Sequence, residues 1–174
     1  GVYLHGVKYC NITGNEIADN AVGILLYYSH YNGISGNTIA KNERWGMVLY
    51  CSYYNVISAN NVTNNLDWGI LIEDSVLNTL RDNNFAGNGA NFGVFPGSWL
   101  RFPDTDPRAE EWHLDDYIQD IDTSNTVNGK PIYYLVNQKD LVLDSSDIGY
   151  IGLINCTNIY VKDATLKNNG QGLL

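Results

Sequence analysis

The chain has 174 residues, with 10 basic and 19 acidic side chains and a formal net charge of −9. This length suits a single elongated domain. The acidic balance argues against DNA or RNA as a partner, because no basic stripe is available to neutralise phosphates. No signal peptide and no apolar run long enough to span a membrane occur in the sequence.

Residues 1–96 repeat every 22 to 24 residues, and glycine and asparagine mark the register. The units start at Gly1, Gly23, Gly46, Gly69 and Gly93. Asparagines follow at two fixed places, which are Asn15, Asn37, Asn60 and Asn83, then Asn20, Asn42, Asn65 and Asn88. Self-similarity at a fixed period predicts stacked structural units.

Aliphatic residues share this register and indicate short strands. The columns are Val2, Ile24, Met47, Ile70 and Val94; Leu4, Leu26, Leu49 and Ile72; Ile12, Ile34, Ile57 and Leu80; Ile17, Ile39, Val62 and Phe85. The spacing of two within the first pair of columns is a strand period. We therefore predict an all-β parallel β-helix with coils of about 23 residues and three strands each, in which asparagines form amide ladders and tight turns. A leucine-rich horseshoe is the nearest alternative, but it needs a denser leucine signature.

Residues 97–125 interrupt the period and are predicted to form an acidic insertion. Thr105-Asp106-Pro107 resembles a helix start, so a short helix is expected at about 107–118. Candidate catalytic acids in this insertion are Asp104, Asp106, Glu110, Glu111, Asp115 and Asp116. Paired carboxylates are the groups that cleave a glycosidic bond. Asp104 and Asp106 could instead bind calcium, or the whole run could be a solvated surface.

Residues 126–174 are predicted to form an irregular coil that returns to the regular stack. Asn128-Gly129 indicates a turn, and residues 132–136 and 141–143 indicate strands. If Tyr150 takes the glycine place, the apolar columns receive Ile151, Leu153, Val161 and Leu166. Asn169 then falls in the second asparagine column, and Cys156 falls in the column of Ser29, Ser52 and Ser75.

The repeat, with Gly23-Ile24 and Ser35-Gly36-Asn37-Thr38-Ile39, resembles that of NosD-type β-helix proteins. Residues 121–134 and 152–158 resemble archaeal NosD-like cell-surface proteins more specifically. The resemblance implies a right-handed parallel β-helix, secretion and a multi-domain surface protein within a wider group of carbohydrate-binding proteins and sugar hydrolases. Bacterial members handle copper in the periplasm. Copper prefers His, Cys or Met ligands, whereas His5, His30 and His113 are scattered and Met47 lies in a core column.

Aromatic residues form three further columns that could bind a glycan. Tyr27 and Tyr50 share one column with His5 and Glu73, Tyr31 and Tyr54 share a second with Tyr9, and Trp45 and Trp68 share a third with Phe92. Sugar rings have apolar faces that can stack on such rings. Alternatively, the rings stack on one another and stabilise the coil.

Three cysteines, Cys10, Cys51 and Cys156, lack the spacing of a metal site and are expected to be buried or half-buried thiols. Three sequons begin at Asn11, Asn61 and Asn155 and fit an extracellular glycoprotein, although a repeat rich in Asn and Thr also produces them by chance.

Taken together, these features favour an extracellular, cell-surface or periplasmic β-helix domain that binds polysaccharide or serves as a cell-envelope scaffold. A glycoside hydrolase or lyase that uses the acids of residues 104–122, and a NosD-type copper protein, remain alternatives. Because the chain starts at a repeat glycine and stops inside a new coil, we expect the parent protein to continue in both directions and to carry other domains.

Overall fold

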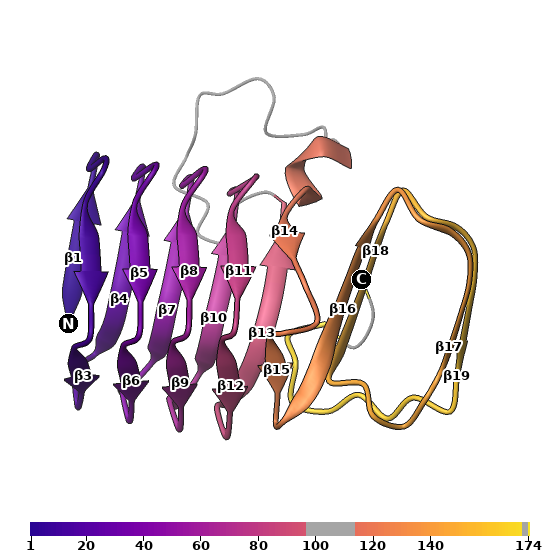
Figure 1. Ribbon diagram of the computed structural model, residues 1–174. Helices are drawn as coiled ribbons and strands as arrows, with labels where there is room; N and C mark the ends of the chain where they lie inside the picture. Colours follow the sequence, from indigo (N-terminus) through magenta and orange to yellow (C-terminus); the bar gives the residue numbers. More distant parts are fainter. Residues whose placement is uncertain (97–113, 172–173) are drawn as a thin grey trace.

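The computed structural model describes residues 1–96, 114–171 and 174, and Figure 1 shows stacked coils that build a rod. Each regular coil contributes one strand to each of three parallel sheets. The first sheet contains β1 (Val2–His5), β4 (Val22–Tyr27), β7 (Trp45–Tyr50), β10 (Trp68–Glu73) and β13 (Ala90–Phe95). The second contains β2 (Asn11–Thr13), β5 (Gly33–Ser35), β8 (Val56–Ser58), β11 (Thr79–Arg81) and β14 (Asp120–Ile121).

The third sheet carries β3 (Glu16–Ala18), β6 (Thr38–Ala40), β9 (Asn61–Thr63), β12 (Asn84–Ala86) and β15 (Thr126–Val127), and then continues into two later strands. The three predicted strands per coil are therefore present. The chain folds as a right-handed parallel β-helix, and the horseshoe alternative is excluded.

The predicted aliphatic columns form the core of the rod. Ile24, Leu26, Ile34 and Ile39 are fully buried, and the equivalent residues of the neighbouring coils pack above and below them. The pairing aligns Ile24 with Met47, and Met47 with Ile70. Because no single coil can bury its apolar face, the stack itself creates this core.

The fifth coil departs from the predicted register. Ile70 pairs with Phe92, and Leu71 pairs with Gly93, so Asn91 stands where earlier coils have glycine. The prediction that Gly93 starts the fifth coil is therefore wrong. Phe92 is therefore a fully buried core residue, not a member of the outer tryptophan column, because the spacing shortens to 22 residues at this step.

Buried amide ladders run along the stack, as predicted. The side-chain oxygen of Asn60 accepts bonds from the backbone and side-chain nitrogens of Asn37, both at 3.0 Å, and Asn60 donates in the same way to Asn83. A third ladder, which the sequence pattern did not predict, contains Asn32, Asn55 and Asn78 followed by Gln119. These ladders satisfy turn backbone groups that would otherwise be buried without partners.

The glycine column makes room for one of these ladders. A Cβ atom on Gly46 would lie 2.6 Å from the side-chain nitrogen of Asn65 and 2.7 Å from the carbonyl oxygen of Gly69. In the fifth coil Asn91 replaces the glycine, and its own side-chain oxygen accepts from Asn88 at 3.1 and 3.0 Å. Glycine is thus needed where a neighbouring asparagine already occupies the space.

The C-terminal part differs from the predicted return to the regular stack. After a turn at Asn128 and Gly129, β16 (Lys130–Val136) runs antiparallel to β15 and parallel to β18 (Tyr150–Ile154). β17 (Lys139–Asp144) pairs with β19 (Thr157–Lys162), so two stacked turns repeat every 18 residues, as Figure 1 shows at its right side.

The reversal overturns several position assignments. Tyr150 pairs with Ile132 and packs against Phe92, so it does not continue the glycine column. Val161 is exposed, and Asn169 bonds the carbonyl of Gly149 outside the asparagine ladder. These assignments extended the 23-residue period across a change of chain direction.

Other predictions for the C-terminal part are confirmed. The two expected strands lie within β16 and β17. Cys156, in contrast, does not continue the column of Ser29, Ser52 and Ser75, because β18 stacks on β16, and its thiol instead contacts the carbonyl oxygens of Leu135 at 3.2 Å and Ile154 at 3.5 Å.

The expected helix at 107–118 is found only in part. Residues 114–117 form the short 3-10 helix η1 (Leu114–Tyr117), and residues 107–113 lie outside the described part of the chain. Among the described residues, no helix is long and apolar enough to cross a membrane.

Candidate functional site

The column of His5, Tyr27, Tyr50 and Glu73 exists as predicted, but its rings are packed. Tyr27 and Tyr50 stack with ring centroids 5.2 Å apart and planes 9° apart, and His5 meets Tyr27 edge-on at 5.0 Å. Only 6% of Tyr50 is exposed, in a cluster with Val48 and Leu71. These rings stabilise the coil, and their faces are already covered.

Both tryptophans of the third aromatic column, Trp45 and Trp68, also contact neighbouring residues. The guanidinium of Arg44 lies 4.3 Å from the ring centre of Trp45. Trp68 meets Phe95 edge-on at 5.6 Å, and the backbone of Gly170 lies directly against its ring. Trp68 therefore anchors the C-terminal segment to the outer side of the first sheet.

The second tyrosine column is the exposed one. Tyr31 and Tyr54 stack with centroids 5.0 Å apart and planes 1° apart, and Tyr9 stacks on Tyr31 at 5.4 Å. All three residues have positive φ, which turns each ring outward at the bend before the second sheet. Exposed fractions of 45% for Tyr31 and 47% for Tyr54 leave ring edges and hydroxyls open to solvent.

An open groove of about 460 Å³ lies beside Tyr31 and Tyr54, on the outer face of the second sheet. Its lining residues are Asn11, Tyr31, Asn32, Gly33, Ile34, Ser35, Tyr54, Val56 and Ser58. The groove exists because Gly33 stands between Asn11 and Val56 in an outward column. Gly33 was not among the predicted site residues, although the alternation of inward and outward residues along these strands places it on the outer face.

The chemistry of this groove is neutral and amphipathic. Hydroxyls of Ser35, Ser58 and the tyrosines, together with the Asn11 amide, can donate and accept hydrogen bonds. Val56 and the ring edges add apolar contact, and no charged residue lines the groove. This combination suits a neutral, hydroxyl-rich ligand.

Of the six candidate catalytic acids, the structure describes only Asp115 and Asp116. Asp104, Asp106, Glu110 and Glu111 lie outside the described residues, as does the calcium prediction on the first two. Asp115 is exposed and Asp116 is half-buried, both on η1. The structure therefore leaves the proposed active-site wall as a prediction.

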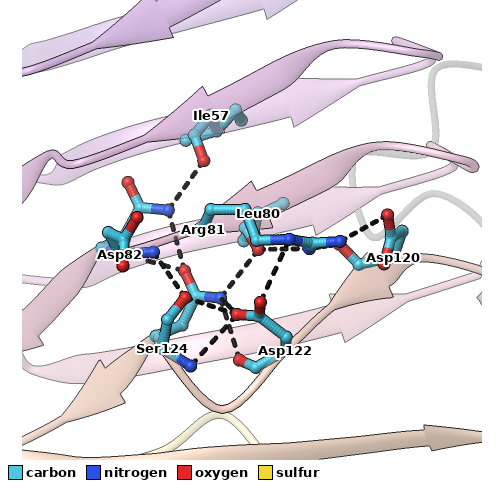
Figure 2. Close-up of polar contacts among 9 residues, drawn as sticks. Ile57, Leu80, Arg81, Asp82, Asp120, Asp122 and Ser124 are labelled. Atoms are coloured by element: carbon cyan, nitrogen blue, oxygen red, sulfur yellow. Dashed lines mark hydrogen bonds and ion pairs between the residues drawn. The ribbon is translucent and has the colours of Figure 1, made fainter.

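Asp120 and Asp122 belong to a structural ion-pair network, which Figure 2 shows. Arg81 contacts the carboxylate of Asp120 at 2.6 Å and that of Asp122 at 3.1 Å. Asp122 also accepts the backbone nitrogen of Ser124 at 3.0 Å, and the Ser124 hydroxyl accepts from the backbone of Asp82 at 2.8 Å. These contacts fasten the chain where it rejoins the stack after the insertion.

The cysteines are free thiols with different environments. Cys10 is exposed, contrary to expectation, whereas Cys51 and Cys156 are half-buried as predicted. Burial raises the pKa of the Cys51 thiol to about 11, and a hydrogen bond from Tyr28 opposes this shift. A thiol with so high a pKa is largely protonated at neutral pH and is a poor nucleophile.

The described residues do not assemble a copper ligand set. His30 uses its Nδ1 to accept the backbone N–H of Tyr53 at 3.1 Å, its ring stacks on Tyr53, and Met47 is fully buried in the core. No three His, Cys, Asp or Glu side chains gather within residues 1–96, 114–171 and 174. The described histidines, cysteines and methionine therefore do not fit a copper site.

Comparisons with known proteins agree with the fold. The periplasmic alginate epimerase AlgG superposes with a TM-score of 0.57 at 22% identity, over 92% of this chain and 36% of the enzyme. A point mutant of the same enzyme gives 0.58 at 22% identity, over 96% and 36%. This chain thus spans about a third of the length of those structures. No curated protein matches the sequence.

One family matches most of the sequence. It is described as periplasmic copper-binding protein (NosD), and the match covers residues 1–119. With its β-helix of glycine and asparagine columns, this chain belongs to the NosD family.

Proposed function

We propose that this domain acts outside the cytoplasm, at the cell surface or in the periplasm, and binds a polysaccharide of neutral sugars in the groove beside Tyr31 and Tyr54. The single observation that carries the proposal is this groove, which is uncharged, lined by hydroxyls and amides, and bordered by exposed rings. The periplasmic description of the family and of the alginate epimerase supports the location.

The stack of tyrosines changes how a sugar would be bound. Because the ring faces cover one another, a glycan would contact ring edges and a row of hydroxyls. The rings repeat once per coil, at about the ~4.8 Å spacing of neighbouring strands. A periodic row of this kind suits a repeating polymer that lies along the rod.

Affinity electrophoresis through gels that contain neutral polysaccharides tests the proposal. We expect at least one of a panel of glucans, mannans and galactans to retard the protein. Replacing both Tyr31→Ala and Tyr54→Ala is expected to weaken that retardation about tenfold, because each ring contributes contact area and a hydroxyl. Tyr160→Ala removes another exposed tyrosine, on β19 and away from the groove, and is the control.

A second variant keeps both tyrosines. A Cβ atom on Gly33 would meet only the side chain of Asn11 within van der Waals distance, with the oxygen at 2.4 Å. Asn11 is exposed and can move aside, so Gly33→Ala is expected to fold normally, fill the groove floor and weaken binding. Equal retardation of all variants would refute the groove as the binding site, and no retardation by any polysaccharide would refute glycan binding and favour a scaffold role.

A further inference from the structure

The exposed tyrosine column places three phenol rings in direct succession. Tyr9, Tyr31 and Tyr54 occupy the same turn of successive coils and share one backbone conformation, with φ of 60°, 58° and 57°. Ring centroids lie 5.4 Å apart for Tyr9 and Tyr31 and 5.0 Å apart for Tyr31 and Tyr54, with planes 17° and 1° apart. Tyr31 is therefore the shared neighbour of two other phenols.

The backbone holds these rings in register. The backbone nitrogen of Tyr31 donates to the carbonyl oxygen of Tyr53 in the next coil at 3.1 Å. The next residue, Asn32, donates from its side chain to that of Asn55 at 3.1 Å, so the same ladder joins the turns of Tyr31 and Tyr54. Two reactive groups that are held as neighbours react far more readily than the same groups free in solution.

Exposure distinguishes this column from the other stack of tyrosines. Tyr9 is 76% exposed, and Tyr31 and Tyr54 are each nearly half exposed. Tyr27 and Tyr50 stack in a similar way, with centroids 5.2 Å apart, but only 6% of Tyr50 is exposed. An external oxidant can therefore reach every ring of the exposed column, but it cannot reach both rings of the buried stack.

Other exposed tyrosines lack a stacked phenol. Tyr28 meets Tyr27 edge-on, with planes 87° apart, and its hydroxyl contacts the thiol of Cys51. Tyr160 is exposed on β19, and no ring contact between described residues includes it. Adjacency and exposure thus coincide in the exposed column.

We propose that this column is an oxidative cross-linking site, at which hydrogen peroxide and a haem peroxidase join Tyr31 to Tyr54 or to Tyr9 as dityrosine. The oxidant removes one electron and one proton from each of two phenols, and one hydrogen peroxide becomes two waters. A carbon–carbon bond then forms between the ring carbons next to the two hydroxyls. The hydrogen on each coupled carbon moves to its own phenol oxygen, so the protein loses two hydrogens in total.

The cross-link locks neighbouring coils together. Residues 31 and 54 are 23 positions apart, so their bond closes one full coil. A covalent link of this kind reduces the conformational freedom of the unfolded chain and so stabilises the folded rod. The site uses the tyrosine rings but not the groove beside them, and it does not rest on glycan binding.

Treatment of dilute protein with hydrogen peroxide and a haem peroxidase tests the site. After thiol reduction, which reverses any disulfide, we expect dityrosine fluorescence and a monomer that intact-mass spectrometry shows to be lighter by two hydrogens. Tyr31→Phe keeps a stacked ring but removes the phenol that both contacts share, so the dityrosine yield should fall at least about tenfold. Tyr27→Phe removes a phenol from the buried stack and is the matched control, with an unchanged yield.

Thermal unfolding of the treated protein measures the lock. Cross-linked wild-type monomer is expected to unfold at a higher temperature than untreated protein, and treated Tyr31→Phe is expected to show no such rise. The cross-linking site is overturned if dityrosine is absent or forms only between chains, if Tyr31→Phe gives the wild-type yield, or if Tyr27→Phe lowers the yield as much. An unchanged unfolding temperature of the cross-linked monomer would overturn the locking role.

Discussion

The regular stack of residues 1–96 and the reversed stack of β16 to β19 both join successive turns through asparagine side chains, but these side chains differ in burial. In the regular stack, asparagines at the turns are buried, with Asn37, Asn60 and Asn83 each 1% exposed. In the reversed stack, Asn155 bonds Asn137 at 2.6 Å and Asn158 bonds Asp140 at 2.7 Å, but both contacts are exposed.

This difference indicates where the stability of the molecule is concentrated. A buried amide ladder must be complete, because each missing partner leaves a desolvated polar group without compensation. An exposed amide pair competes with water and can be lost at small cost. The regular stack should therefore tolerate substitutions at its turns far less well than the reversed stack.

The strongest test of this comparison is Asn60→Ala. The substitution removes the acceptor of the backbone and side-chain nitrogens of Asn37 and the donor to the carbonyl of Ile34, and it takes one of two donors from the side-chain oxygen of Asn83. We expect the free energy of unfolding to fall by about 4 kcal/mol, at about 1–3 kcal/mol for each unsatisfied buried group. Chemical denaturation followed by circular dichroism measures this loss.

Two controls belong to the same experiment. Asn61→Ala removes the neighbouring, exposed asparagine, whose side chain accepts a bond from Asn84, and should cost less than about 1 kcal/mol. Asn155→Gly removes the exposed bond from Asn155 to Asn137 in the reversed stack. Glycine adopts the positive φ of residue 155 without strain, so the loss of unfolding free energy should be similarly small. Equal effects at Asn60 and Asn61 would contradict the ladder argument.

Gly46→Ala is expected to have the second largest effect. Its Cβ would press on Asn65, Val62 and the backbone of Gly69, all between 2.6 and 2.7 Å, so the stability should fall by about 3 kcal/mol. Gly14→Ala meets no atom within 4 Å and suffers only from its positive φ of 70°, so about 1 kcal/mol is expected. Thermal unfolding of both variants compares the steric clash at Gly46 with the backbone strain at Gly14. A larger loss of stability for Gly14→Ala would refute the steric argument.

Arg81→Met examines the junction between the two regions. Arg81 is 32% exposed in its side chain and holds two carboxylates, so its loss should lower the free energy of unfolding by about 1 kcal/mol. Asp67→Asn removes an exposed pair at 3.6 Å with Arg44, leaves Arg44 against the ring of Trp45, and should change the free energy of unfolding by less than about 0.5 kcal/mol. Urea denaturation at low and high salt measures both losses. The loss of unfolding free energy caused by Arg81→Met should depend more strongly on salt than the loss caused by removing the Arg44–Asp67 pair. The opposite ranking would argue against the Arg81 network.

The smallest expected effect concerns pH and His30. Burial, and then the positive charge of Lys8, lower the pKa of His30 below its ordinary value, so the folded state favours the neutral ring. Protons then bind the unfolded state more readily, and stability should decline modestly as pH falls below about 6.5. Denaturation at about pH 7.5 and about pH 5.5 should show a smaller decline for His30→Asn, whose side-chain oxygen can still accept from Tyr53.

Nuclear magnetic resonance titration provides the direct check on His30. The Lys8→Met variant should raise the pKa of the His30 imidazole, because it removes the nearby positive charge. A His30 pKa above the ordinary value in wild-type protein would show that the assigned causes are wrong.

Much of the regular stack was predictable because its signals are local and repeated. The columns that contain Ile24, Leu26, Ile34 and Ile39 were placed correctly from spacing alone, and so were the asparagine ladders through Asn60 and Asn65. The stacking of Tyr31 on Tyr54 follows from the same columns. Repetition makes each coil a check on the next, so one misleading residue does not alter the rest.

One error arose where the repeat changes, and another arose where neighbouring side chains cover an outward column. The glycine at 93 suggested a register that the pairing of Phe92 with Ile70 excludes. Tyr27 and Tyr50 looked equivalent to Tyr31 and Tyr54 as outward rings, yet Tyr50 is buried. Exposure depends on what packs over a column, and the column itself does not contain that information.

The amino-acid sequence by itself determined the coil, its length and its buried asparagines, because stacked identical units need only a local pattern that is repeated. The tertiary structure decided which tyrosines reach solvent, where Gly33 opens a groove, and where the chain reverses direction after Asn128. Those features depend on contacts between segments that are far apart in the chain, and a repeat pattern cannot specify such contacts.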